Sequence, residues 1–255
     1  MPHFRILTLA ACVSLAIPTL AIGAQTHEPQ RPEPPLKNLK YFPKNISRSA
    51  LLDTMHTFTR ALGVGCEFCH MVDDSIPRER HDFSSDVKPN KIKARTMLRM
   101  VAAINNDYLT KLQPRLQPPV VVSCETCHRG VMEPRPLEQV ILTRYDSAGT
   151  DSAIALYRDL RKHYYGRASY DFGEAPLAGV GGALRMRNRT ADALRFYMLN
   201  LEFAPASSFA WSQAGSAQLA SGDTATAIKS LEKALSLDST NRQATRALQA
   251  LRPKP

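Results

Sequence analysis

Apolar side chains recur every three to four residues along most of this chain, which is the pattern of amphipathic helices. One helix is predicted to begin at Ser47 or Ser49 and to end at Gly63 and Gly65. Its inward face is expected to carry Leu51, Leu52, Met55, Phe58, Thr59 and Leu62. A second helix is predicted over residues 91–108, with Met97, Met100, Val101, Ile104 and Tyr108 inward. The fold class is therefore mainly α.

From about residue 150 the pattern itself repeats every 34 residues. Trp211, Gly215, Ala227, Leu231 and Ala234 form the later copy, and the earlier copy comprises Leu177, Gly181, Leu184, Ala193, Tyr197 and Pro205. These positions resemble two tetratricopeptide (TPR) repeats, with flanking helices at 152–165 and 242–251. The resemblance implies a short α-solenoid of TPR-like helical hairpins. Such an array presents a surface for a partner protein or peptide, or serves as a helical spacer.

In the first half, each predicted helix precedes a C-x-x-C-H segment, at residues 66–70 and 124–128. Two thiols three residues apart can add to the two vinyl groups of one haem, and the following imidazole can ligate its iron. The sequence therefore predicts two covalently bound haem c groups. The attachment residues are Cys66, Cys69, Cys124 and Cys127, and the axial ligands are His70 and His128. The alternative is a pair of C-x-x-C redox or zinc sites, each followed by a histidine by chance.

A methionine on each helix is a candidate for the sixth ligand of the iron. Met55 stands 11 residues before Cys66 on the apolar stripe, where its thioether can reach the iron or simply pack in a core. Met97 and Met100 are both candidates before the second motif, and periodicity does not separate them. His81, in the loop after the first motif, is either a nitrogen ligand or a surface residue.

The stretches 55–70, 94–105 and 122–130 resemble the cytochrome c subunit of photosynthetic reaction centres. In that family each haem unit is a helix with a methionine ligand, a turn and a C-x-x-C-H segment. The resemblance covers about residues 36–138. It implies a multihaem cytochrome c domain, supports Met55, selects Met97 over Met100, and implies electron transfer between redox partner proteins. The family subunit carries four haems, so this chain corresponds to one two-haem half, and a photosynthetic host does not follow.

Composition and charge restrict the partners. The 255-residue chain has a formal net charge of +10, and its basic residues are scattered instead of gathered in a nucleic-acid-binding fold. We therefore expect no nucleic acid partner. The charge suits neutralisation of haem propionates and an acidic redox partner.

The chain is predicted to have four segments. Residues 1–24 are typical of a secretory signal peptide, which predicts export to the periplasm. This leader also suits a membrane anchor, and Cys12 suits a lipoprotein signal, either of which would allow a membrane-associated complex. Residues 25–43 form a Pro-rich linker or strap, residues 44–138 the dihaem domain and residues 139–255 the TPR-like domain.

Three functions fit these features. The first is a dihaem electron carrier in which histidine and methionine fill both axial positions of each iron. The second is a peroxidase-like dihaem enzyme, with one five-coordinate iron and His81 or Glu79 as the acid–base group. The third is a haem-based redox or gas sensor in which the repeats carry the function. A methionine before each motif favours the carrier, for which no catalytic residue is expected.

Overall fold

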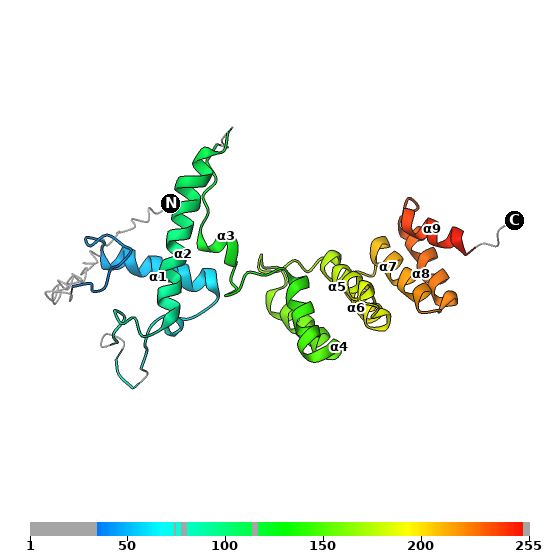
Figure 1. The fold of residues 1–255 in the computed structure, drawn as a ribbon, viewed down its shortest axis with the longest axis horizontal. Helices are drawn as coiled ribbons and strands as arrows, with labels where there is room; N and C mark the ends of the chain where they lie inside the picture. Colours follow the sequence, from blue (N-terminus) through cyan, green and yellow to red (C-terminus); the bar gives the residue numbers. More distant parts are fainter. Residues whose placement is uncertain (1–34, 74, 78–80, 114–116, 252–255) are drawn as a thin grey trace, which may run out of the picture. The chain divides into compact units, whose positions relative to one another are not determined.

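The computed structural model describes residues 35–73, 75–77, 81–113 and 117–251, and within these ranges the regular structure is helical (Figure 1). The chain divides into residues 1–37 and residues 38–255. The predicted signal peptide and most of the predicted linker lie outside the described residues. Among the described helices, none has the length and apolar character needed to cross a bilayer.

Helix α1 spans Arg48–Leu62 and begins and ends as its sequence predicts. The Ser47 side chain accepts a hydrogen bond from the Ala50 amide, and Gly63 closes the helix with a positive φ of 67°. A side chain at Gly63 would place its Cβ 2.2 Å from the Gly130 carbonyl oxygen. The Gly130 amide in turn donates to the Ala61 carbonyl at 2.9 Å. The end of α1 therefore packs against the turn that follows the second C-x-x-C-H segment.

Helix α2 spans Pro89–Ala103 and continues through a π-helical turn, η3 (Ile104–Tyr108), and a 3₁₀ turn, η4 (Leu109–Lys111). The predicted helix over 91–108 is thus present, but its last part is wound more widely. The wider turn rotates the residues after Ile104 out of the α-helical register. Tyr108 is consequently 66% exposed, and the prediction that it faces inward is wrong.

The two haem motifs adopt short helical turns. Residues Cys66–Phe68 form the 3₁₀ turn η1, and Cys124–His128 form helix α3. The chain reaches α3 through a segment that Asn105 holds in place, because the Asn105 side chain exchanges two hydrogen bonds of 2.8 Å with the Val122 main chain.

The second half is an array of paired helices. It comprises α4 (Leu137–Tyr164), α5 (Glu174–Met186), α6 (Thr190–Phe203), α7 (Ser208–Ala220), α8 (Thr224–Leu237) and α9 (Arg242–Ala250). Helices α5, α7 and α9 begin 34 residues apart, as do α6 and α8. The predicted flanking helix over 242–251 is therefore the first helix of a third period. The other flanking helix, α4, begins earlier than predicted and is interrupted at Gly149, where φ is 77°.

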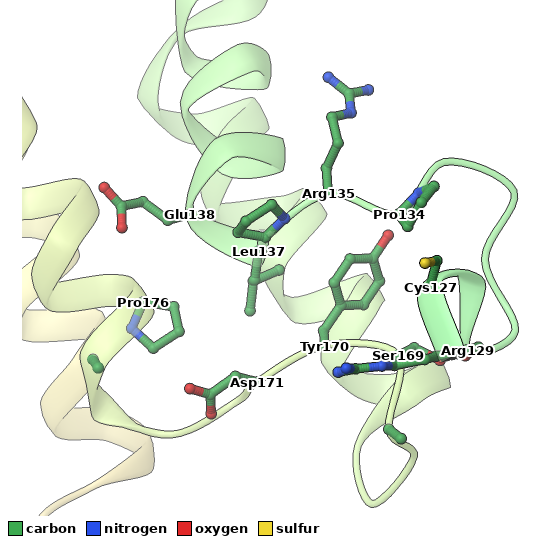
Figure 2. Close-up of a pocket in the computed structure, with 13 residues that line it drawn as sticks. Cys127, Arg129, Pro134, Arg135, Leu137, Glu138, Ser169, Tyr170, Asp171 and Pro176 are labelled. Carbon is green, nitrogen blue, oxygen red and sulfur yellow. Dashed lines mark hydrogen bonds between the residues drawn. The ribbon is translucent and has the colours of Figure 1, made fainter. Parts of the chain in front are cut away.

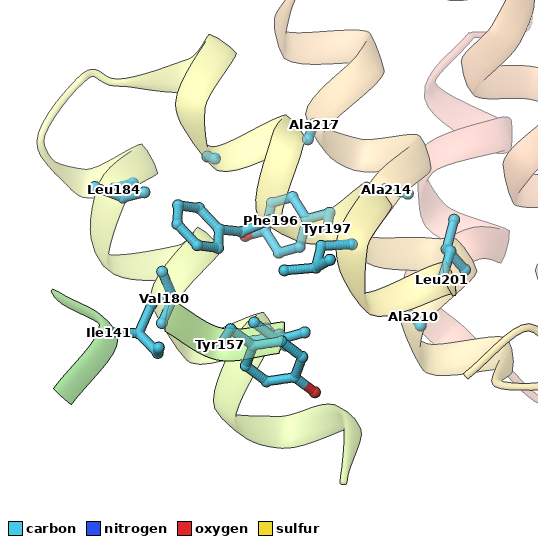
Figure 3. Packing of buried hydrophobic residues seen from close by; sticks show 14 of the residues in the cluster. Ile141, Tyr157, Val180, Leu184, Phe196, Tyr197, Leu201, Ala210, Ala214 and Ala217 are labelled. Atoms are coloured by element: carbon cyan, nitrogen blue, oxygen red, sulfur yellow. The ribbon is translucent and has the colours of Figure 1, made fainter. Parts of the chain in front are cut away.

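The main hydrophobic core lies in this array and includes Ile141, Tyr157, Val180, Phe196 and Tyr197 (Figure 3). Close approach of paired helices needs the small residues that the repeat pattern predicts. A Cβ on Gly181 would lie 2.5 Å from the Tyr197 ring, and one on Gly215 would lie 2.8 Å from Leu231. The predicted mainly α fold, with TPR-like helical hairpins, is confirmed.

The region that bears the haem motifs is packed differently. Of its described hydrophobic residues between 38 and 136, protein atoms bury only Ala61 and Val131 almost completely. Leu52 on α1 is 45% exposed and Ile92 on α2 is 53% exposed. Leu52 was expected to share the inward face, but it lies one residue outside the stripe of Leu51, Met55, Phe58 and Leu62, all of which are partly buried. Polypeptide packing alone therefore gives this region little core.

Candidate haem-binding sites

The two motif histidines have the same hydrogen-bond arrangement. The His70 Nδ1 lies 2.9 Å from the Phe83 carbonyl oxygen, and the His128 Nδ1 lies 3.0 Å from the Val131 carbonyl oxygen. Because a carbonyl oxygen only accepts, each Nδ1 is the donor, and in a neutral imidazole this leaves Nε2 with its lone pair. This is the tautomer, and the orienting contact, that a metal-ligating imidazole requires.

The cysteines are chemically available at both motifs. Cys66, Cys69, Cys124 and Cys127 are all free thiols. In each motif the two cysteines stand three residues apart on a helical turn, which places their side chains on one side of it. Burial raises the pKa of the Cys69 and Cys124 thiols, and Cys127 is exposed. Both motifs therefore fit covalent attachment of a haem followed by imidazole ligation.

The candidate methionines lie on α1 and α2 as predicted. Met55 is partly buried, whereas Met97 and Met100 are 45% and 47% exposed. The nearly equal exposure of Met97 and Met100 does not separate them, so both methionine ligands, Met55 and Met97, stay predictions. The exposed apolar side chains of α1 and α2 are the kind of surface that a porphyrin ring covers, which fits haem binding on these helices.

The His81 side chain contacts main-chain carbonyl groups of the loop after the first motif. Its Nε2 lies 2.9 Å from the Asp73 carbonyl oxygen and 3.1 Å from that of Ile76. Its ring is 5.7 Å from that of Phe83, which lies 5.3 Å from the His70 ring. His81 thus packs behind the residue that orients His70, and its ligand role stays a prediction. Glu79 lies outside the described residues.

A partly buried lysine shares the carbonyl that orients His70. Lys91 Nζ donates to the Phe83 carbonyl oxygen at 2.8 Å and to the Ser85 carbonyl oxygen at 2.9 Å. The Lys91 side chain is only 13% exposed, and burial lowers its pKa. The pKa of His70 is also lowered, first by burial and then by the Lys91 charge. Sequence reasoning missed this contact, because a main-chain carbonyl acceptor leaves no residue-type signal.

The segment before α1 lies across the loop that carries Phe83. Lys40 Nζ and Arg95 Nη1 bind the Asp86 carboxylate at 2.7 and 2.8 Å. The hydrogen bond from Lys40, with that from Arg95, holds the pKa of Asp86 well below its usual range. The Asn38 side chain donates to the Ser84 carbonyl at 2.6 Å. Residues 38–40 therefore form a strap over the loop that carries Phe83.

The second motif borders a cavity of about 420 Å³ (Figure 2). Cys127, Arg135 and Tyr170 are among the residues that line it. The Ser169 hydroxyl donates to the Arg129 carbonyl at 2.6 Å, which ties the loop between α4 and α5 to the end of α3. Aromatic residues at the end of α4 and in this loop pack on one another, with the Tyr164 and Tyr170 rings 5.5 Å apart.

Comparison with known proteins finds relatives of the motif-bearing region. Residues 43–145 match the family described as the photosynthetic reaction centre cytochrome C subunit. Cytochrome c-554 of Chloroflexus aurantiacus is 41% identical over 70 residues, which are 28% of this chain and 14% of that protein. The predicted resemblance is therefore confirmed for this region. The match spans only a small part of the relative's length.

Solved TPR structures are similar to the helical array. The second TPR domain of human RPAP3, in complex with an HSP70 peptide, is 18% identical with a TM-score of 0.33, and the match covers 46% of this chain and 93% of that chain. PcrH, in complex with the chaperone-binding region of PopB, is 18% identical with a TM-score of 0.31, covering 45% and 91%. The assignment of TPR-like hairpins rests on the 34-residue spacing of α5 to α9.

Proposed function

We propose that this chain is a periplasmic dihaem c-type cytochrome that transfers single electrons between redox partner proteins. The observation that carries the proposal is the matched pair of imidazoles, each held through Nδ1 inside a C-x-x-C-H segment. The match of residues 43–145 to the reaction centre cytochrome family supports it. Periplasmic location rests on the leader at residues 1–24.

The residues have separate tasks in this proposal. Cys66 and Cys69 hold one haem and Cys124 and Cys127 hold the other, which keeps the cofactor from being lost after export. His70 and His128 would each supply one protein ligand to an iron, and Met55 and Met97 would supply the other. When bound, haem c supplies a one-electron iron couple, and histidine–methionine ligation raises its potential. A haem iron held by both histidine and methionine would have no open coordination position.

The test is haem content followed by an optical redox titration of the exported protein. We expect the mass of two haems on the purified chain and two titrating centres. The reduced spectrum should not change under carbon monoxide, because a gas ligand needs an open or labile position. A single haem would contradict the dihaem assignment. A carbon monoxide complex would favour the peroxidase-like enzyme or the gas sensor.

The helical array is proposed to present a partner-binding surface beside the cytochrome. Stacked hairpins of constant period create one continuous face, which is how repeat proteins bind other chains. Cross-linking of the exported protein in cells, with and without residues 166–255, tests this role. Cross-linked partners that persist unchanged after the deletion would assign the array to a purely structural role.

A further inference from the structure

We infer that Lys91 raises the reduction potential of the haem held by the first motif. The inference rests on the proposed function. The two histidine sites differ in the donors that reach the carbonyl oxygen at Nδ1. Both imidazoles contact a main-chain carbonyl through Nδ1, but only the first carbonyl, that of Phe83, also accepts a hydrogen bond from a partly buried cation. Among the described residues, no lysine or arginine hydrogen bond to the Val131 carbonyl is present.

The shared carbonyl links Lys91 to the iron ligand. A strong acceptor at Nδ1 makes an imidazole electron-rich and favours Fe(III), and outer contacts of this kind tune metal sites. Lys91 Nζ, at 2.8 Å, draws electron density from the same oxygen and weakens its hold on the His70 proton. His70 then donates less charge to the iron, and the reduced state is favoured.

The electrostatic field acts in the same direction. Oxidation adds a positive charge at the haem, which a neighbouring cation disfavours, most strongly where water does not screen it. The charged groups around Lys91 are Lys40, Lys88 and Arg95 on the cationic side, and Asp82 and Asp86 on the anionic side. Asp86 forms ion pairs with Lys40, Arg95 and, at 3.6 Å, Lys91, so one carboxylate is shared among three cations. The excess charge beside His70 is therefore positive.

The experiment compares the midpoint potentials of both haems in the full-length holoprotein. Lys91→Met removes the charge and the donor, Lys91→Gln keeps a donor without charge, and Lys91→Arg keeps the charge. Lys93→Met, on the exposed side of the same helix, is the matched control. A variant with Cys124→Ala and Cys127→Ala retains only the first haem and assigns the potentials.

We expect Lys91→Met to lower one midpoint and leave the other in place. The equilibrium constant for electron exchange between the haems should change about tenfold, which for a one-electron couple corresponds to about 59 mV. Lys91→Gln should also lower the midpoint potential of the first haem, whereas Lys91→Arg should keep it at the wild-type value. Lys93→Met should change neither midpoint potential. The shift should persist when only the first haem is present. If Lys91→Met does not mature, Lys91→Gln alone decides the question.

Two failures are distinguishable. If no haem attaches to the wild-type chain, the proposed function is wrong. If two haems attach but Lys91→Gln moves neither midpoint, or Lys93→Met moves one equally, the role of Lys91 is overturned. Thermal unfolding of each variant shows whether the substitution has destabilised the fold. A change in midpoint potential caused by local unfolding would also appear in Lys91→Arg.

Discussion

Met55 and Met97 are the predicted methionine ligands, one on the helix before each motif. If both bind iron as proposed, each iron is six-coordinate. Imidazole stabilises Fe(III) more than a thioether does, so replacing either methionine by histidine should lower one midpoint potential and leave the other unchanged. Met100→His is the control, because Met100 is on the same helix and as exposed as Met97. Redox titration of the three variants checks this. A shift in Met100→His without one in Met97→His would exchange their roles.

Asp192 joins the two parts of α4 on either side of the break at Gly149. Its carboxylate accepts hydrogen bonds from the Tyr145 and Thr150 hydroxyls, both at 2.7 Å, and so fastens both sides of Gly149. The bond from Thr150, followed by that from Tyr145, lowers the pKa of Asp192 below its usual value. A carboxyl group whose pKa is lowered by folding stabilises the fold fully at pH values above its unfolded-state pKa of about 3.9. This contribution is lost as the pH falls through the folded-state pKa.

We therefore expect Asp192→Ala to reduce the free energy of unfolding by about 2 kcal/mol at neutral pH. The difference from the wild type should shrink progressively below about pH 4, where the wild-type carboxyl takes up its proton. Urea unfolding followed by circular dichroism at several pH values measures it. Asp151→Ala is the control, because that side chain is 88% exposed in its ion pair with Arg195 and should contribute little. A deficit that is constant with pH would contradict the linkage.

At the scale of the helix pair, two adjacent glycines on α5 have opposite surroundings. A Cβ on Gly181 would lie 2.5 Å from the Tyr197 ring, whereas one on Gly182 would meet nothing within 4 Å. Gly181→Ala should destabilise the array by about 1–3 kcal/mol, because α5 and α6 must separate. Gly182→Ala should stabilise it by up to about 1 kcal/mol, because alanine costs less backbone entropy in a helix. Denaturant unfolding of the two variants provides the comparison, and equal effects would refute the close packing.

Several helices and site residues could be predicted from the sequence, and others could not. The bounds of α1 follow from Ser47 and Gly63, and the 34-residue period predicted the TPR-like hairpins. The flanking helix predicted over 242–251 is α9. The π turn at Ile104 was missed because no residue type marks it, and the start of α4 was missed because its Gly149 break divides the periodic pattern. The cysteines and histidines were named from their spacing, but the partners Phe83, Val131 and Lys91 depend on tertiary contacts.

The whole molecule combines two regions whose stability has different sources. The array buries a continuous apolar core that includes Tyr157, Leu184 and Phe196. The region between residues 38 and 136 buries few apolar side chains against protein atoms, and several on α2 are exposed. A region with so little core needs a covalent or cofactor staple. The two haems proposed above, linked through the four cysteines, would be that staple.

A variant with all four motif cysteines changed to alanine should therefore separate the two regions. We expect slow amide hydrogen exchange to survive across α5 to α8, because the array core needs no cofactor. Amides of α1 and α2 should exchange at nearly unprotected rates, because the remaining contacts cannot offset the chain entropy. The haem-loaded wild type is the control and should protect both regions. Protection of α1 and α2 without haem would show that polypeptide contacts alone hold them, and loss of protection in the array would show that it depends on the cytochrome.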